Sequence, residues 1–414
     1  MPTFSIPLSG LTAMSTALSE IANNLANLNT VGYKDTRVLF RDLFYQSIGS
    51  SGAGNPIQLG AGAAVSSMPS LFTQGNVTPT GVNKDVAIND AGFFIAQKDG
   101  AVTYTRAGDF SVDENDLLVT DDGQQVLGYP AVNGAINTGL GLTSLKLGAG
   151  TISPPTATSS VQISTNLNAA AAVGSNDGSY STPITVYDSL GASHSLSFSF
   201  TKTASNTWTY SISIPAADLG GTGNPTVLNT GTLVFDGNGN LTSPTADVAN
   251  IAIKNLADGA NDMSFTWKLY DGTTPVVTQV AAANGTSDTQ QDGRVSGALS
   301  DFSVGSDGII TGTFSNGKTA ILGQLALATF ANEQGLSRTG KNGFAETLAS
   351  GQAVVGAPGT GGRGTLAGGA LELSNVDIAT EFANMIVMQR GFQANARVVT
   401  TFDEITQDTI NLKR

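Results

Sequence analysis

The sequence predicts a mostly β fold with long α-helical termini and nested domains. The N- and C-terminal helices are expected to form a coiled-coil-like inner domain, and the middle domains are expected to be sandwich- or barrel-like. Three observations lead to this prediction. Apolar residues near the start recur at heptad spacing, and a second apolar stripe closes the chain of 414 residues. The residues between them alternate short β-prone runs with turn signals rich in Gly, Asn and Asp.

The first predicted element is one amphipathic helix over residues 9–30. Its only charged residue is Glu20, and Thr30-Val31-Gly32 is expected to end it, with Gly32 in the left-handed conformation of a helix C-terminus. Spacings of three and four residues define a seam that favours packing against another helix. The seam consists of Leu11, Met14, Leu18, Ile21, Leu25 and Leu28.

The last predicted element is a helix of about nine turns, or roughly 50 Å. Ser374 and Asp377 predict a capping box at its start. Its apolar stripe consists of Ile378, Phe382, Met385, Phe392, Val399, Phe402, Ile405 and Leu412. We expect this helix to pair with the N-terminal one. A lone pair buries only one face of each helix, so both apolar stripes are also expected to form a self-assembly interface between copies of the chain.

Changes of pattern along the chain predict the domain boundaries. Segments 47–64 and 351–369 are glycine-rich and aperiodic, which favours loop or extended chain. A β-meander is followed by a Thr/Ser-rich block with period-two alternation, typical of an antiparallel sandwich or barrel. The expected parts are a helical inner domain (1–30 plus 371–414), a Gly-rich connector (31–70 plus 351–370), a β-rich domain (71–145 plus 286–350) and an inserted outer β domain (146–285).

A short phrase recurs within the β-rich regions. FSVDENDLLVT at 110–120 and FSVGSDGIITG at 302–312 share Phe-Ser-Val, a turn and an aliphatic pair, and LVFDGNGNLTS at 233–243 is a looser copy. These phrases predict similar hairpins, the first two belonging to one domain that the insert interrupts.

Composition restricts the classes of function. Only 12% of residues are charged, and the formal net charge is −13, which argues against nucleic acid and anionic membrane surfaces as partners. The absence of cysteine excludes disulfides, thiolate catalysis and Cys-ligated metals. No apolar run approaches the ~18–20 residues of a membrane span. The N-terminus lacks the features of a secretory signal, so we expect a soluble chain whose export would need no signal cleavage.

Candidate reactive motifs have simpler interpretations. Residues 359–364 match GxGxxG, but no helix opens directly on them, so a connector is favoured over dinucleotide binding. Asp236-Gly237-Asn238-Gly239-Asn240 resembles the start of a calcium loop but lacks the required Gly and Glu further on, which favours a hairpin turn. The single histidine, His194, is expected to be a polar residue at a strand edge. We therefore predict no enzyme, no catalytic residue, no cofactor and no metal site.

Both ends of the chain resemble a known family. SGLTAMSTALSEIANNLANLNTVGYK closely resembles the N-terminal signature of bacterial flagellar rod and hook proteins, and LELSNVDIATEFANMIVMQRGFQANARVV resembles their C-terminal signature. The motif positions are Asn23, Asn24, Asn27, Asn29, Thr30, Gly32, Tyr33, Ser374, Asn375, Gln389, Arg390 and Asn395. Asn23, Asn24, Asn27 and Asn29 could be surface amides of the helix or could bond to neighbouring subunits. Arg390 and Arg397 could be solvated or could form inter-subunit ion pairs. DVAINDAGFFIAQ is also similar to an inner segment of the group.

Three features favour the hook type within this family: the full length, the insert, and the phrases TPITVYDSLGASHSLSFSF and GTLVFDGNGNL within it. The resemblance implies a structural subunit of the flagellar hook, a curved tubular helical polymer outside the cell that transmits motor torque from rod to filament as a universal joint. The alternatives are a distal rod protein of the basal body or a secreted β-rich adhesin.

The resemblance also implies partners and a location. The chain would bind copies of itself, the hook cap, the distal rod protein, the hook–filament junction protein, the hook-length control protein and the flagellar type III export apparatus. It would be extracellular, in the flagellum, and exported without a cleaved signal peptide. The terminal helices would line the central channel of the tube.

Overall fold

The computed structural model describes residues 5–44, 46–132, 134–148 and 150–412. Contacts divide the chain into two compact units. Unit 1 comprises Met1–Thr151, Ser300–Thr313 and Thr319–Arg414, and unit 2 comprises Ile152–Leu299 and Phe314–Lys318. The insert predicted at 146–285 falls largely in unit 2, which extends to Leu299 because a strand after residue 285 pairs back onto its sheet.

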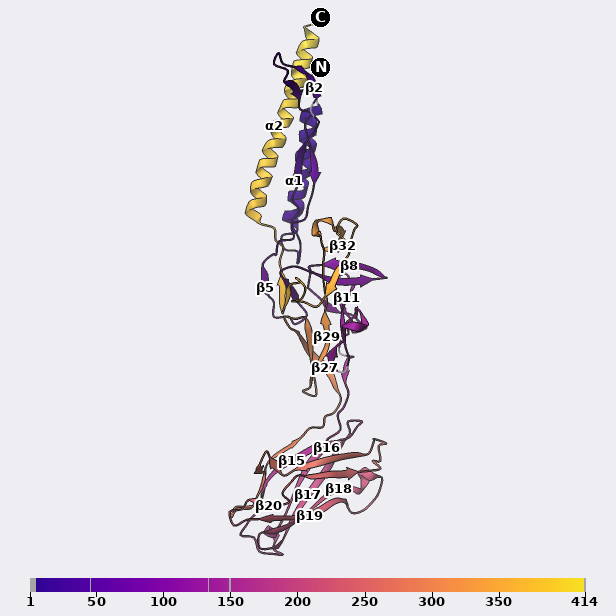
Figure 1. Ribbon diagram of the computed structural model, residues 1–414, viewed down its shortest axis with the longest axis vertical. Coiled ribbons are helices and arrows are strands. Elements are labelled where there is room, and N and C mark those ends of the chain that lie inside the picture. The colour runs from indigo at the N-terminus through magenta and orange to yellow at the C-terminus, as the bar shows by residue number, and fades with distance from the viewer. Residues whose placement is uncertain (1–4, 45, 133, 149, 413–414) are drawn as a thin grey trace. The chain divides into compact units, whose positions relative to one another are not determined.

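Unit 1 contains the two long helices, α1 (Ser5–Ala26) and α2 (Ile378–Asn411), which lie side by side and run in opposite directions (Figure 1). The predicted pairing of the ends within the chain is thus confirmed. Packing is close. A Cβ added to Gly10 would lie 2.9 Å from the Asn395 amide nitrogen, and one added to Gly391 would lie 3.2 Å from the Met14 sulfur. Within the described ranges, neither helix is long and apolar enough to cross a membrane.

The predicted helix ends need correction. α1 ends at Ala26 rather than at residue 30, because turn hydrogen bonds take over from there, such as that from the Thr30 N–H to the Asn27 carbonyl. Gly32 does have a left-handed φ of +66°, but six residues beyond the helix. The capping box predicted at Ser374 and Asp377 is wrong. α2 begins at Ile378, and Asp377 itself is the N-cap, accepting a 2.7 Å bond from the Thr380 N–H.

The segment after α1 is more ordered than the predicted connector. It contains the antiparallel pairs β1–β4 and β2–β3. Helix α1 packs against β4, and its Ala13 is buried. The second predicted connector also pairs with the body, and its glycines allow close packing: a Cβ on Gly364 would overlap the Asn89 carbonyl. The strands outside the main sheet of unit 1 are β1 (Leu39–Asp42), β2 (Gln46–Ser50), β3 (Pro56–Leu59), β4 (Ala63–Ser67), β5 (Val77–Pro79), β6 (Val86–Asn89), β34 (Thr365–Gly368) and β35 (Ala370–Glu372).

The main sheet of unit 1 combines strands from both flanks of the insert. Its central order is β27-β28-β29-β11-β7-β8-β32-β31. The strands are β7 (Phe93–Lys98), β8 (Ala101–Thr105), β9 (Ser111–Val112), β10 (Leu118–Val119), β11 (Gln125–Val132), β12 (Ala135–Ile136), β13 (Thr143–Ser144), β27 (Gly297–Val304), β28 (Ile309–Phe314), β29 (Thr319–Leu325), β30 (Leu327–Thr329), β31 (Ser337–Gly340), β32 (Gly343–Ala345) and β33 (Val354–Gly356), with the short helices η1 (Thr138–Leu140) and η4 (Glu333–Gly335) between them.

The recurring hairpins are confirmed. β9 pairs with β10, β27 neighbours β28, and β19 pairs with β20 in unit 2. Phe110 and Phe302, the first residues of the two FSV phrases, belong to the same buried cluster of unit 1 as Leu118 and Ile310. Equivalent positions of the two phrases therefore fill one core, although more than 180 residues separate them in the sequence.

Unit 2 is a sandwich, in which inward-facing residues of two sheets share one core containing Phe198, Trp208, Phe265 and Trp267. The predicted all-antiparallel pattern holds for the β16-β17-β18-β19-β20 sheet, but β15 pairs in parallel with β22 and β25, so the other sheet is mixed. Its elements are β14 (Ile152–Ser153), β15 (Ser160–Asn166), β16 (Ser179–Tyr187), β17 (Ser193–Ala204), β18 (Thr207–Ile214), β19 (Thr226–Phe235), β20 (Leu241–Ser243), β21 (Val248–Ile253), β22 (Met263–Lys268), β23 (Tyr270–Asp271), β24 (Thr274–Pro275), β25 (Val277–Thr278), β26 (Gly285–Gln291), η2 (Asn176–Gly178) and η3 (Ala216–Leu219).

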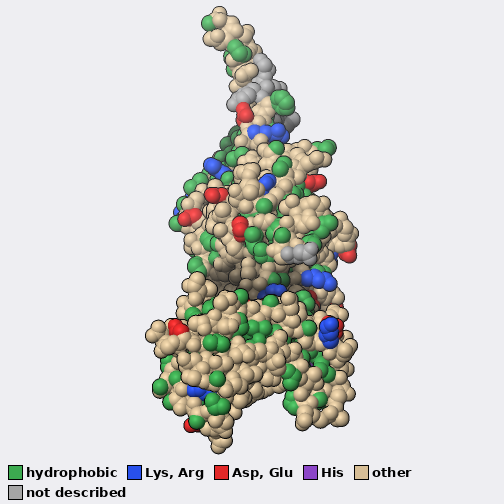
Figure 2. All heavy atoms as spheres, turned by 60° about the horizontal axis from the view of Figure 1, so that its bottom comes forward, with side chains coloured by type: hydrophobic (Ala, Val, Ile, Leu, Met, Phe, Trp, Pro, Cys, Tyr) green, Lys and Arg blue, Asp and Glu red, His purple; other side chains and the backbone are tan. Residues whose placement is uncertain are grey.

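The turn at Asp236 behaves as predicted. Its Oδ1 accepts bonds from the Asn238 and Asn240 N–H groups, at 2.9 and 2.8 Å, so the carboxylate holds a hairpin turn. On the face drawn in Figure 2, charged side chains are scattered among hydrophobic and uncharged polar atoms, as the low charged fraction of the sequence leads one to expect.

Candidate functional site

The sequence motifs of the two termini meet where α1 ends and α2 begins. We call this junction the terminal clasp. It consists of Asn24, Tyr33, Lys34, Thr36, Glu372, Asn375 and Glu381. All of them belong to unit 1, and they connect segments that are more than 300 residues apart in the sequence.

Asn24 is the most fully bonded side chain of the clasp, and it is only 1% exposed. Its amide nitrogen donates to the Thr36 carbonyl at 3.0 Å and to Glu381 Oε2 at 3.3 Å. Its amide oxygen accepts from the Tyr33 hydroxyl at 3.1 Å and from the Thr36 N–H at 3.3 Å. Asn24 thus uses its donors and acceptors within its own chain, and the prediction that the motif asparagines could bond to neighbouring subunits has no support at this position.

A fully buried ion cluster lies next to it. Lys34 Nζ is 2.6 Å from Glu372 Oε1, and Arg106 Nη1 is 3.4 Å from Glu372 Oε2. The Gly75 N–H also donates to Glu372 Oε1, at 2.8 Å. Burial lowers the pKa of Lys34, and the charge of Glu372 offsets part of that shift. One carboxylate therefore compensates two buried cations from two different parts of unit 1.

Asn375 ties the segment before α2 to the body. Its side-chain oxygen accepts a 2.7 Å bond from the Asp35 N–H, and its amide donates to the Leu71 and Thr73 carbonyls at 2.8 and 3.1 Å. These bonds hold the residues just before α2 in an extended path, which explains why the helix cannot begin at Ser374. Ser374 is left with a long 3.4 Å bond from the Val376 N–H.

Gly32 is a glycine for a local reason. A Cβ at this position, with φ of +66°, would lie 2.5 Å from the Ala107 backbone nitrogen, and the Gly32 N–H donates to the Glu372 carbonyl at 2.8 Å. Tyr33 is then placed beneath Arg338, whose guanidinium lies 5.3 Å from the ring centroid. The Gly-Tyr-Lys stretch thus has a packing role at each of its three residues.

The predicted seam of α1 is confirmed as half-buried or buried. Ile21 is buried, and the remaining members are half-buried: Leu11, Met14, Leu18, Leu25 and Leu28. In α2 the predicted stripe divides. Met385, Val399 and Phe402 are half-buried, whereas Ile378, Phe382, Phe392, Ile405 and Leu412 are exposed.

The remaining motif residues have local or no described partners. Asn23 donates to the Tyr33 hydroxyl at 3.1 Å, Asn27 accepts from the Thr30 hydroxyl at 3.1 Å, and the Asn395 amide donates to the Gly391 carbonyl at 3.0 Å. The exposed motif residues are Asn23, Asn29, Gln389 and Arg390, and Arg397 is exposed as well.

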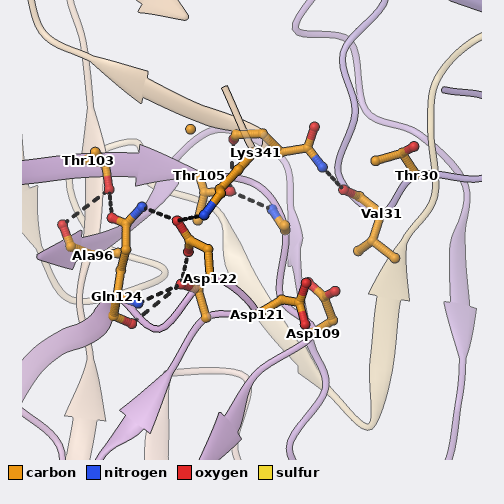
Figure 3. Close-up of a pocket in the computed structure, with 14 residues that line it drawn as sticks. Thr30, Val31, Ala96, Thr103, Thr105, Asp109, Asp121, Asp122, Gln124 and Lys341 are labelled. Carbon is orange, nitrogen blue, oxygen red and sulfur yellow. Dashed lines mark hydrogen bonds and ion pairs between the residues drawn. The ribbon is translucent and has the colours of Figure 1, made fainter. Parts of the chain in front are cut away.

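A pocket of about 350 Å³ lies beside the residues that follow α1 (Figure 3). Turn chemistry shapes it: Asp122 accepts bonds from Thr120 at 2.5 Å and Gln124 at 2.8 Å, and Lys341 approaches it at 3.7 Å. Burial raises the pKa of Asp109, which also lines the pocket. Asp122 therefore holds a turn.

Sequence reasoning missed the charged members of the clasp and misplaced His194. Lys34, Glu372 and Glu381 went unnoticed, although Glu372 is in phase with the buried Ala370 on β35. His194 is buried rather than at a strand edge, since it shares the inward phase of Leu196 and Phe198 on β17. For Glu372 and for His194, the two-residue period of the strand indicated that the side chain is buried.

Comparisons with known proteins match four segments of the chain to family descriptions. Family descriptions match residues 6–34 (Flagella basal body rod protein), 87–166 (Flagellar hook protein FlgE/F/G D1 domain), 156–294 (Flagellar basal body protein FlaE D2 domain) and 367–412 (Flagellar basal body rod FlgEFG protein C-terminal). A crystal structure of Helicobacter pylori FlgE2 shares 16% identity over 71% of this chain and all of that chain. Its TM-score of 0.45 is too low to support an inference.

Curated relatives extend over nearly the whole chain. The flagellar hook protein FlgE of Escherichia coli K12 is 37% identical, over 99% of this chain and 100% of the relative. That of Treponema pallidum is 33% identical, over 98% of both. The hook resemblance is thus confirmed over the distal rod alternative. The chain belongs to the flagellar hook protein FlgE family, the structural subunits of the hook.

Proposed function

We propose that this chain assembles with copies of itself into a curved tube, with its terminal helices at the interface between subunits, and that the tube transmits torque while it bends. The observation that carries this proposal is the uncovered apolar face of α2. Phe382, Ile386 and Val387 are 51%, 58% and 62% exposed, on a helix whose other face packs on α1. Further exposed apolar residues on this helix are Phe392, Val398, Ile405 and Ile410.

Magnitudes favour many neighbours over a simple dimer. Fully burying a Phe or Ile side chain contributes roughly 1.5–3 kcal/mol, so covering the exposed half of one adds about 1 kcal/mol. Association costs an estimated 4–15 kcal/mol. One contact of this kind is insufficient, but a helical lattice surrounds each subunit with several neighbours and covers the whole face at once. The first hairpins provide further apolar surface at Phe40, Phe44, Ile48, Ile57 and Leu59.

Phe382→Asp tests the proposal. It places a charge on the uncovered face without touching the α1 seam, so the monomer should keep its helical circular dichroism while sedimentation and electron microscopy show no tubes. The matched control is Phe382→Leu, which keeps an apolar side chain at the same exposed position and should still assemble. Tubes of normal yield and curvature from Phe382→Asp would refute the role of this face.

The clasp supports this proposal by fixing the helix pair to the β body, so that a force on the helices reaches the body through bonded side chains. Asn24, Lys34 and Asn375 each join segments from both termini. Buried hydrogen bonds connect the segment that contains Asn24 to the segment that contains Glu381.

The proposed setting is the extracellular flagellum. We infer export through the flagellar type III apparatus without signal cleavage, and contacts with the hook cap, the distal rod protein, the hook–filament junction protein and the hook-length control protein. The intact mass of the exported protein should equal that of the same protein retained inside cells whose export apparatus is blocked. An exported form that lacks an N-terminal segment would contradict export without cleavage.

A further inference from the structure

Four titratable side chains meet in unit 2, away from the terminal helices in sequence. His194, near the start of β17, has Nε2 3.1 Å from Asp188 Oδ2 and 3.8 Å from Asp258 Oδ2. Its Nδ1 lies 3.2 Å from Asp218 Oδ2. The His194 side chain is 7% exposed and that of Asp188 is fully buried. The carboxylates come from three separate segments: the turn after β16, η3, and the loop between β21 and β22.

The imidazole cannot satisfy this arrangement as a neutral group. A neutral histidine has one N–H and one lone pair. If Nδ1–H donates to Asp218, the Nε2 lone pair faces the oxygens of Asp188 and Asp258, which are themselves acceptors. Among the residues that the structure describes, no donor other than His194 bonds to Asp188 Oδ2. A positive species must therefore lie between Nε2 and the two carboxylates.

Asp188 is held in place for such a species. Its Oδ1 accepts bonds from the Leu190 and Ala192 N–H groups, at 2.8 and 2.9 Å, which turns Oδ2 toward the histidine.

We propose that Asp188, His194 and Asp258 bind a divalent transition-metal ion of the zinc class, with Asp218 fixing the Nδ1–H tautomer. Their ligand atoms all lie within 4.8 Å of one another. Zinc bonds of about 2.0–2.1 Å in tetrahedral geometry separate ligand atoms by about 3.3 Å. The 3.1 and 3.8 Å separations around Nε2 bracket this value. One imidazole with two carboxylates suits zinc, whereas calcium prefers six or more oxygens.

Asp218 has the position of a second-layer partner. A carboxylate that accepts the free N–H of a metal-binding histidine orients the ring and raises its basicity. The bound ion would join the β16–β17 turn of one sheet to the β21–β22 loop of the other, so it would staple the two sheets of unit 2. Stapling predicts a measurable gain in the stability of the sandwich, because the ion binds only the folded form.

The first test is zinc titration of the metal-stripped full chain, with zinc sulfate as the probe, followed by calorimetry and by thermal unfolding. Both tryptophans of the chain, Trp208 and Trp267, lie in the core of unit 2, so their emission reports on this unit. Binding of one zinc per chain with a rise in the unfolding midpoint is expected. Asp258→Asn should weaken binding at least tenfold. The matched control, Asp271→Asn on β23, should bind as the parent does.

The second test uses the single histidine. Its Hε1 resonance in a chain labelled only at histidine is unique, since His194 has no other histidine to overlap with. Stoichiometric zinc should shift this signal, and Asp218→Asn should reduce affinity 10–100-fold while the fold is kept. Equal zinc affinity in Asp258→Asn and the parent would overturn the proposal. So would a histidine signal that titrates with pH but does not respond to zinc, since the cluster would then hold only a proton.

Discussion

Replacing Glu372 with alanine should lower the stability of unit 1 and leave unit 2 unchanged. The carboxylate is fully buried and is the shared counter-charge of Lys34 and Arg106. Its removal leaves two buried cations without a partner and also removes the acceptor of the Gly75 N–H. Breaking a buried ion pair by removing one member costs about 3–5 kcal/mol. Lys34 can limit the cost by losing its proton, because burial already lowers its pKa.

The assay separates the two units by signal. Both long helices belong to unit 1, so far-UV circular dichroism of the helices follows that unit, whereas tryptophan emission follows unit 2. For a loss of about 4 kcal/mol, the urea midpoint of the helical signal should fall by about 1–2 M. The tryptophan transition should keep its midpoint.

A matched control distinguishes the buried charge from a general loss of a glutamate. Glu114 lies exposed in the turn between β9 and β10, so Glu114→Ala should change the free energy of unfolding by less than about 0.5 kcal/mol. If Glu372→Ala shifts the helical transition no more than Glu114→Ala does, the clasp does not stabilise unit 1 and the reasoning from its burial is refuted.

Three further predictions use the same preparations. Asn24→Ala should destabilise unit 1 by about 2–3 kcal/mol, since it strands several buried polar groups, while exposed Asn29→Ala should not. Acid should weaken unit 2, because the pKa of Asp188 is about 2 in the folded state and 3.8 in the unfolded state. About 2 kcal/mol of stability is therefore present above pH 4 and is lost as the pH falls toward 2. Asp188→Asn should flatten this pH dependence of unfolding, as followed by tryptophan emission. Replacing residues 154–296 by an Asn-Gly turn, which closes the β14–β27 pair, should preserve tube formation but change curvature, as electron microscopy would show; loss of all assembly would contradict this.

Local patterns in the sequence predicted the elements well. Period-two runs predicted strands such as β17 and β18, and turn chemistry predicted the hairpins around Asp113 and Asp236. These signals are local, because a turn is decided by the four or five residues that form it. The same reasoning was incomplete for the segment after α1, where glycine suggested loop or extended chain but the segment pairs with itself as β1–β4 and β2–β3.

The clasp could not be predicted by the same means. Lys34 and Glu372 are 338 residues apart, and neither has a distinctive neighbour that indicates a buried ion pair. Only the fold brings them together, by way of β35 and the turn after α1. For His194, as for Glu372, the two-residue period of the strand already indicated burial, although the polarity of the side chain suggested exposure. Within a strand, the position of a residue in the two-residue period is thus a stronger signal of burial than the polarity of its side chain.

The division of the α2 stripe has a physical cause that bears on assembly. The seam between the helices in one chain is close because it uses small residues, with Gly10 against Asn395 and Gly391 against Met14. Large apolar residues such as Phe382 and Ile386 lie outside this seam. A pair of helices that had only its own stability to satisfy would place the large residues between them, where burial contributes most. The heptad pattern of α2 therefore contains more apolar positions than α1 of the same chain covers. The exposed half of this stripe favours packing against helices of neighbouring subunits.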